Sequence, residues 1–273
     1  MAGVRLAGVG RAAGVSGDWD KRYDHSAVLI LALDTTTRAG SVAVARNDDI
    51  LAVVEGDGAR THGERMPGEI EAALIAAGVH ASDLQLLVVA SGPGAFTGLR
   101  IGLAAIQGLA MVLGVPVVGV SALDALAATA SSSLESHETL VFAWMDAARG
   151  EVFGADYDRS HGPRDRSNSD PSFVWRSTAG PVVAAPATIL SALDAARVRS
   201  MVFVGDGAVR YAFEIGAWSR GLSRVLDTPP ALAPALVRVG RRLAATGAAG
   251  PPHALQPLYV RRPDAELERL RRS

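Results

Sequence analysis

The sequence predicts an α/β protein made of two related lobes that face each other across a cleft. Three observations carry this prediction: short apolar runs alternate with helical patterns, buried runs lead into glycine-rich turns, and the second half repeats the order of the first. The chain has 273 residues, of which 49% are hydrophobic, enough to fill a substantial core in one or two domains.

The first lobe is expected over residues 27–125, starting with a β-hairpin and a third strand. Helices, strands and a further helix then alternate, and apolar residues in the first helix recur at i, i+4 and i+7, with Gly78 as its stop. The strands are expected at 27–33, 41–45, 50–55, 84–90 and 115–120, and the helices at 61–77, 98–113 and 122–130.

The second lobe is expected over residues 126–273 and repeats the arrangement of strand, Asp, turn and strand. An apolar strand at 140–145 leads into Asp146, and another at 201–204 leads into Gly205-Asp-Gly207. A helix is predicted at 234–245, with four residues turned inward: Leu236, Val239, Gly240 and Leu243.

Three segments fall outside this α/β pattern. Residues 1–26 are expected to be a disordered N-terminal extension, and 158–179 a polar, solvent-exposed insertion. The C-terminal tail is Arg-rich, at Arg261, Arg262 and 269–272. These arginines are interleaved with Asp and Glu, which favours a solvated tail over a phosphate-binding one.

The composition excludes several kinds of chemistry. Only one of the 27 basic residues is a lysine, Lys21, so the Gly-Lys-Ser/Thr of a P-loop is absent. Schiff-base catalysis would have to use Lys21, which lies in a polar segment. The chain has no cysteine, which excludes thiol nucleophiles, disulfides, thiolate zinc sites and iron–sulfur clusters. The net charge of −1 gives no global reason to expect nucleic-acid or membrane binding.

No secretory signal or membrane span is expected. Arg5 and Arg11 interrupt any apolar signal region. Residues 101–123 are uncharged and long enough to cross a bilayer, but the turn Gly114-Val-Pro116 divides them into a helix and a strand. We therefore expect a cytoplasmic protein.

The turn Asp34-Thr35-Thr36-Thr37 lies between two buried strands. Its hydroxyls and backbone N–H groups are candidate contacts for phosphate, and Asp34 could hold a metal through water. The alternative is that Asp and Thr cap their own turn.

A glycine-rich turn at 91–98 ends a buried strand and opens a helix, where free N–H groups favour anions. Its candidate phosphate contacts are Gly92, Gly94 and Thr97. In the alternative interpretation Thr97 is only the helix N-cap.

The remaining motifs do not indicate a metal site or a hydrolase. The six histidines form no His-x-x-x-His or His-Glu-x-x-His pair, and no Gly-x-Ser-x-Gly elbow is present. A peptidase would need a nucleophile and a base, and no such pair is visible. His62, at the start of the first long helix, is typical of a surface or capping residue.

Five motifs follow one another along the chain: Leu31-Ala-Leu-Asp34-Thr-Thr-Thr, Ser91-Gly-Pro-Gly-Ala-Phe-Thr-Gly-Leu-Arg-Ile-Gly102, Gly114-Val-Pro-Val-Val-Gly-Val-Ser121, Asp146-Ala-Ala-Arg-Gly-Glu-Val-Phe153 and Pro257-Leu-Tyr-Val-Arg-Arg-Pro-Asp264. Their order is that of the TsaB (YeaZ) family of tRNA threonylcarbamoyladenosine biosynthesis proteins, which the chain resembles over roughly residues 28–265.

The resemblance implies a two-lobed actin/Hsp70-like (ASKHA) fold, each lobe a mixed sheet with helices. It also implies membership of the complex that makes N6-threonylcarbamoyladenosine (t6A) at position 37 of tRNA, with the transferase TsaD and the ATPase TsaE as partners and tRNA reached through the complex. TsaD carries a metal-binding His-x-x-x-His where this chain has Ala122 and Leu126, so the resemblance implies a non-catalytic scaffold subunit without a metal.

In the family, the two long helices of the first lobe form the dimer face, and the chain alone is a candidate homodimer. We assign five interface residues to the helices at 61–77 and 98–113: His62, Met66, Leu99, Leu103 and Ile106. In the alternative interpretation Leu103 and Ile106 face the core, and a charge placed there would unfold the chain. No cofactor of its own is expected, with ATP or ADP a candidate at a subunit interface.

A stand-alone ATPase or phosphotransferase of the same fold is the alternative function. Asp34, Thr35 and Thr36 would then hold phosphate, and Asp146 would order Mg²⁺ or water. Gly205 and Gly207 would contact adenosine, although a single Gly-Asp-Gly turn is a weak signal for adenosine binding. Fold alone does not decide between the two functions.

Overall fold

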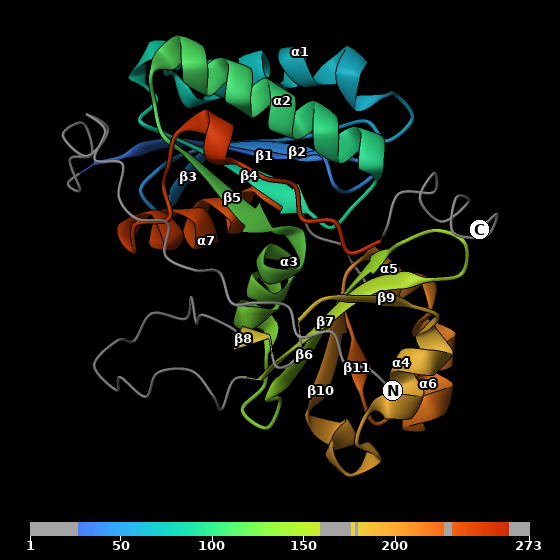
Figure 1. The fold of residues 1–273 in the computed structure, drawn as a ribbon. Helices are drawn as coiled ribbons and strands as arrows, with labels where there is room; N and C mark the ends of the chain where they lie inside the picture. Colours follow the sequence, from blue (N-terminus) through green and yellow to red (C-terminus); the bar gives the residue numbers. More distant parts are fainter. Residues whose placement is uncertain (1–26, 159–175, 178–179, 227–230, 262–273) are drawn as a thin grey trace.

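The computed structural model of the chain describes residues 27–158, 176–177, 180–226 and 231–261. Two mixed sheets stand one beyond the other, with helices outside and between them (Figure 1). The extension at 1–26, most of the insertion at 158–179 and the tail beyond Arg261 lie outside the described residues.

The first sheet has the strand order β3-β2-β1-β4-β5. Strands β1, β2 and β3 pair antiparallel, as the predicted hairpin requires, whereas β4 and β5 join parallel to β1. The strands are β1 (Leu29–Asp34), β2 (Ser41–Arg46), β3 (Asp49–Glu55), β4 (Leu86–Gly92) and β5 (Val117–Ser121).

The second sheet repeats this topology. β6 pairs antiparallel with β7, which pairs antiparallel with β9, whereas β10 and β11 join parallel on the other side of β6. The internal repeat predicted from sequence is therefore present in the strand order. The strands are β6 (Leu140–Asp146), β7 (Val152–Asp158), β8 (Arg176–Ser177), β9 (Val182–Ala184), β10 (Met201–Val204) and β11 (Arg224–Val225).

The central strand β1 is apolar on both faces because each face is covered. Leu31 and Leu33 point into the core beneath the outer helices, whereas Ile30 and Ala32 point into the core between the two sheets. The sequence of β1 is therefore a continuous apolar run rather than an alternating one.

Helices α1 (His62–Ala77) and α2 (Phe96–Leu113) cover the outer face of the first sheet (Figure 1). Each ends at a glycine in the left-handed conformation, Gly78 after α1 and Gly114 after α2. Outside the second sheet, buried residues of α4 (Pro186–Ala192) and α6 (Ala212–Ser219) complete a third core. The short α5 (Asp206–Arg210) follows β10 and packs against β6.

Helices α3 (Ala122–Ala130) and α7 (Ala233–Ala245) fill the space between the sheets and pack on each other. α7 lies in the second half of the sequence but covers β1, β2, β4 and β5 of the first sheet, so the expected division into contiguous lobes at residue 125 is corrected. The cause is an apolar helix face that turns Leu236 and Gly240 toward the first sheet, where Gly240 approaches Val88 closely.

The close approach at Gly240 predicts the effect of adding a methyl group there. A Cβ would lie 2.5 Å from Cγ1 of Val88, a short and stiff side chain. We expect Gly240→Ala to lower the free energy of unfolding by about 1–3 kcal/mol in urea denaturation. Gly216→Ala in α6 is the matched control, since nothing lies within 4 Å of its added Cβ and a helical alanine stabilises by about 0.5–1 kcal/mol. Equal effects of the two substitutions would contradict the packing argument.

Candidate functional site

A cavity of about 850 Å³ opens between the two lobes, within the range of small-ligand sites. Its first-lobe wall is formed by the turn after β1, the loop before α1 and the start of α2. The opposite wall comes from the β6–β7 turn and the start of α5, and the segment 258–261 runs along the rim.

The structure brings some of the predicted site residues to this cavity and places the others elsewhere. Thr36, His62, Gly94, Leu99 and Asp146 line it. The cavity lining does not include Asp34, Thr35, Gly92, Thr97, Gly205 or Gly207.

Asp34 uses both carboxylate oxygens to hold its own turn. Oδ1 accepts hydrogen bonds from the backbone N–H (2.8 Å) and the hydroxyl (2.6 Å) of Thr36, and Oδ2 accepts one from the Thr37 hydroxyl (2.5 Å). Asp34 is also buried. This geometry supports the interpretation that the turn caps itself, rather than presenting its oxygens to phosphate or metal.

The threonines of this turn pack against the glycines of the 91–102 motif. A Cβ on Gly94 would lie 2.6 Å from Cβ of Thr36, and one on Gly102 would lie 2.1 Å from Oγ1 of Thr35. Oγ1 of Thr35 is buried without a hydrogen-bond partner. The glycine spacing in α2 is therefore explained by close packing of the helix on the β1–β2 turn.

Gly205 and Gly207 have a similar packing role in the second lobe. A Cβ on Gly205 would lie 2.3 Å from the carbonyl oxygen of Trp144, and one on Gly207 2.8 Å from the carbonyl carbon of Met145. Together with Asp34 and Thr35, these residues do not form an open phosphate site. Of the nine predicted contacts, only Thr36, Gly94 and Asp146 remain candidates for a ligand in the cavity.

Helix α2 begins earlier than the sequence suggested. Its N-cap is Ala95, which offers no side-chain cap, and Thr97 lies inside the first turn. The prediction of Thr97 as N-cap is therefore wrong.

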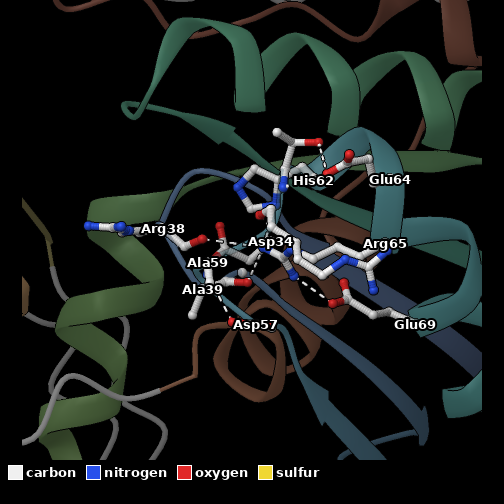
Figure 2. A network of polar contacts seen from close by, with 12 residues as sticks. Asp34, Arg38, Ala39, Asp57, Ala59, His62, Glu64, Arg65 and Glu69 are labelled. Atoms are coloured by element: carbon white, nitrogen blue, oxygen red, sulfur yellow. Dashed lines mark hydrogen bonds and ion pairs between the residues drawn. The ribbon is translucent and has the colours of Figure 1, made fainter.

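Arg65 organises the first-lobe wall of the cavity, and the sequence analysis did not single it out (Figure 2). Although its side chain is buried, it donates to the carbonyl oxygens of Arg38, Ala39 and Arg60 and forms an ion pair with Glu69 (2.5 Å). The i,i+4 spacing of Arg65 and Glu69 was the available signal, but it does not reveal the loop carbonyls.

His62 links this network to the turn after β1. Its Nε2 lies 3.1 Å from the carbonyl oxygen of Thr37, and its Nδ1 lies 2.8 Å from a guanidinium nitrogen of Arg65. A neutral ring that donates from Nε2 and accepts at Nδ1 satisfies both contacts. Burial, and secondly the charge of Arg65, lower the pKa of His62, so the neutral form is favoured.

Two carboxylates lie in the second-lobe wall. Asp146 accepts a hydrogen bond from the N–H of Ala148 and forms an ion pair with Arg210 (2.6 Å). Asp206 accepts from the N–H groups of Asp146 and Gly207, and its burial raises its pKa. Both side chains thus stabilise the turns that carry them.

The segment 255–261 crosses from the first lobe to the second. The N–H of Leu258 donates to the carbonyl oxygen of Ser91 (2.7 Å), and Arg261 donates to the carbonyl oxygen of Ala147 (2.7 Å) and pairs with Glu151. A Cβ on Gly92, whose φ is 116°, would lie 2.6 Å from the carbonyl oxygen of Leu258. This explains why glycine stands at position 92.

The assigned interface residues lie mostly in the core. Met66, Leu99, Leu103 and Ile106 are buried beneath α1 and α2 against the first sheet, so these side chains offer no surface to a partner. This corrects the choice of residues, because the side of each helix richest in large apolar residues faces the sheet. The same helices expose Ile75 (73%), Met111 (74%) and Val112 (84%) instead.

Helix α2 has the length and apolar character of a membrane span, with a mean hydropathy of 1.6. It packs against β4 through its buried side, and only 33% of the helix is buried. Its exposed side carries Arg100 near the N-terminal end and the apolar residues Met111 and Val112 near the C-terminal end.

Comparisons with known proteins match this architecture. The family model described as TsaD, tRNA N6-adenosine threonylcarbamoyltransferase, matches residues 53–170. An uncharacterized Mycobacterium tuberculosis protein is 32% identical, over 87% of this chain and 93% of its own length. The tRNA threonylcarbamoyladenosine biosynthesis protein TsaB of Haemophilus influenzae is 34% identical, over 61% of this chain and 68% of its own length.

The chain belongs to the TsaB (YeaZ) family. The solved structure of YeaZ from Pseudomonas aeruginosa superposes with a TM-score of 0.67 at 28% identity, covering 85% of this chain and 99% of that one. The two-lobed α/β fold inferred from the TsaB resemblance is confirmed.

The two positions compared with the TsaD histidines lie within the segment that matches the TsaD family model. In this TsaB-family chain Ala122 and Leu126 are buried between the lobes. Among the described residues, no group of three His, Asp or Glu side chains is placed to hold a metal ion.

The lowered pKa of His62 predicts a pH-dependent stability. Its folded pKa lies below the ordinary 6.5, so the unfolded chain takes up the proton first. The contribution of His62 to the free energy of unfolding is therefore complete above pH 6.5 and declines as the pH falls toward the folded pKa. His62→Gln should reduce this decline in urea unfolding measured between about pH 7.5 and 5.5.

The exposed His80 supplies the control for this experiment. His80→Gln should leave the pH dependence as it is in the unchanged chain. A pH dependence in His62→Gln equal to that of the unchanged chain would contradict the assignment.

Proposed function

We propose that this chain acts in the biosynthesis of tRNA threonylcarbamoyladenosine, as a non-catalytic partner subunit of a TsaD-type transferase. Its family membership supports the pathway, since relatives such as that of Haemophilus influenzae are named for this biosynthesis. The observation that carries the partner role is the exposed apolar surface on α1 and α2.

This surface, which we call the α1/α2 face, comprises Ile75, Met111 and Val112. All three side chains are more than two-thirds exposed and come from the two helices on the outer side of the first sheet. Covering large apolar side chains with a partner gains about 25 cal/mol per Å² of buried apolar area. Two adjacent helices that expose such side chains suit a second helix pair of similar composition.

Two further observations support a non-catalytic role. Ala122 and Leu126 replace the histidines of TsaD with side chains that cannot ligate a metal, and both are packed in the core. Both carboxylate oxygens of Asp34 accept hydrogen bonds from its own turn.

The proposed complex further includes a TsaE-type ATPase and tRNA, with ATP or ADP at a subunit interface. The free chain uses the α1/α2 face to form a homodimer.

Charge placed on the α1/α2 face should disrupt docking without unfolding the chain. We expect the double substitution Met111→Glu, Val112→Glu to weaken co-purification with a TsaD-type transferase by at least about tenfold, because two carboxylates would be buried on docking. The same variant should lose t6A formation in a reconstituted assay and shift a free homodimer to monomer in size-exclusion chromatography.

Two further variants test this interpretation. Phe213→Glu changes an 85% exposed residue on the other lobe and should leave docking unchanged. Leu103→Glu places a charge in the core and should yield little folded protein. Retention of the transferase by the folded Met111→Glu, Val112→Glu variant would refute the proposed face.

A further inference from the structure

We propose that the mouth of the interlobe cavity binds a segment of single-stranded RNA. Stacked aromatic rings beside several arginines, exposed at the edge of a large opening, carry this inference. The choice of RNA as the ligand rests on the proposed function in tRNA modification. The binding surface at the cavity mouth rests on the contacts of its aromatic rings and arginines.

Phe96 and Tyr259 form a stacked pair at the rim. Their ring centroids are 5.5 Å apart and their planes differ by 28°. The guanidinium carbon of Arg100 lies 3.8 Å from the Phe96 ring centroid, and its Nε donates to the Tyr259 hydroxyl (3.0 Å). Both rings line the cavity and both are 41% exposed. Such partly exposed, pre-aligned rings are the groups on which nucleic-acid bases stack.

Arginines from both lobes surround the same opening. Arg38, Arg60 and Arg149 are exposed and line the cavity from the turn after β1, the loop before α1 and the β6–β7 turn. Figure 2 shows that Arg38 extends away from the network around Arg65. Its Nε bonds the carbonyl oxygen of Gly58, which orients the side chain and leaves its charge unneutralised by that contact.

The acidic groups of the walls are engaged with the protein itself. Asp146 pairs with Arg210 and Glu151 pairs with Arg261. Asp206 accepts backbone hydrogen bonds from Asp146 and Gly207. The cavity lining includes four arginines, Arg38, Arg60, Arg149 and Arg261, against two aspartates, Asp146 and Asp206. The lining is therefore basic, although the whole chain carries a net charge of −1 and Arg60 also interacts with the charge of Glu64.

The exposure of these groups favours a polymer over a small ligand. Small-ligand sites bury most of their ligand's surface, whereas these arginines and rings stand at the exposed edge. An acidic peptide would use the arginines but has no bases to place on the rings. A single strand offers phosphates to the arginines and bases to Phe96 and Tyr259.

The test is fluorescence anisotropy of the full chain with a labelled, unstructured oligoribonucleotide at several salt concentrations. Arg38→Glu, Arg60→Glu should weaken binding at least about tenfold, and each lost phosphate contact should reduce the slope of log K against log salt by about 0.7. Phe96→Ala should weaken binding roughly tenfold, and Phe96→Tyr, which keeps a ring, should retain it.

Arg46→Glu is the matched control for charge, because Arg46 is exposed at the far end of β2, in register with Leu29 rather than with Asp34. It should bind as the unchanged chain does. Thermal unfolding should confirm that every variant is folded. If Phe96→Ala does not fold, the rings are tested through Tyr259→Ala, which should weaken binding to a similar extent.

Four results would overturn the proposal. Equal loss in Arg46→Glu and Arg38→Glu, Arg60→Glu would show non-specific attraction. Competition by free mononucleotides as effective as that of the RNA would indicate a small-ligand site, and competition by polyglutamate would indicate an acidic peptide. Unchanged binding in the cavity variants would place any RNA contact elsewhere. None of these results affects transferase docking through the α1/α2 face, which remains separately testable.

Discussion

The apolar layer of α3 and α7 between the two sheets sets the geometry of the whole molecule. Side chains from both sheets and both helices form one continuous core, in which Ile30, Val141 and Leu236 are completely buried. Because this core is shared, the turns at the strand ends of each lobe are held at a fixed separation. The interlobe cavity lies outside this layer, since no residue of α3 or α7 lines it.

Many polar groups in the cavity walls already have hydrogen-bond partners within the protein, whereas others are exposed to solvent. Asp34 holds the turn after β1 through hydrogen bonds from Thr36 and Thr37, and Arg65 donates to the carbonyl oxygens of Arg38 and Ala39. Buried polar groups need such partners, since an unpaired one costs about 1–3 kcal/mol. The side chains that can still contact a ligand are the exposed arginines at the rim, Arg38, Arg60 and Arg149. Asp34 of the sequence motif instead stabilises the protein itself.

The α1/α2 face and the cavity lie on separate parts of the first lobe but share α2. Its buried side fixes the glycines against Thr35, its N-terminal Phe96 stands at the cavity, and its C-terminal Met111 and Val112 are exposed. One helix therefore connects the proposed partner surface to the proposed RNA surface. In these two proposals the chain brings two macromolecules together by binding alone.

The sequence by itself determined the five strands of the first sheet, β6, the start of β7, β10, the long helices and the repeat, because apolar period and glycine stops are local signals, as at Gly78 and Gly114. It did not predict β8, β9, β11 or the short helices α4, α5 and α6. It also supplied the family motifs. It could not place α7 on the first sheet or turn Leu103 inward, because both depend on contacts between residues distant in sequence. The bonds of Asp34 are local, to residues two and three positions along the chain, but the sequence left both interpretations of this turn open. Only the tertiary structure decided that Arg65 is buried at the centre of a hydrogen-bond network and that Phe96 meets Tyr259, since both require segments distant in sequence to come together.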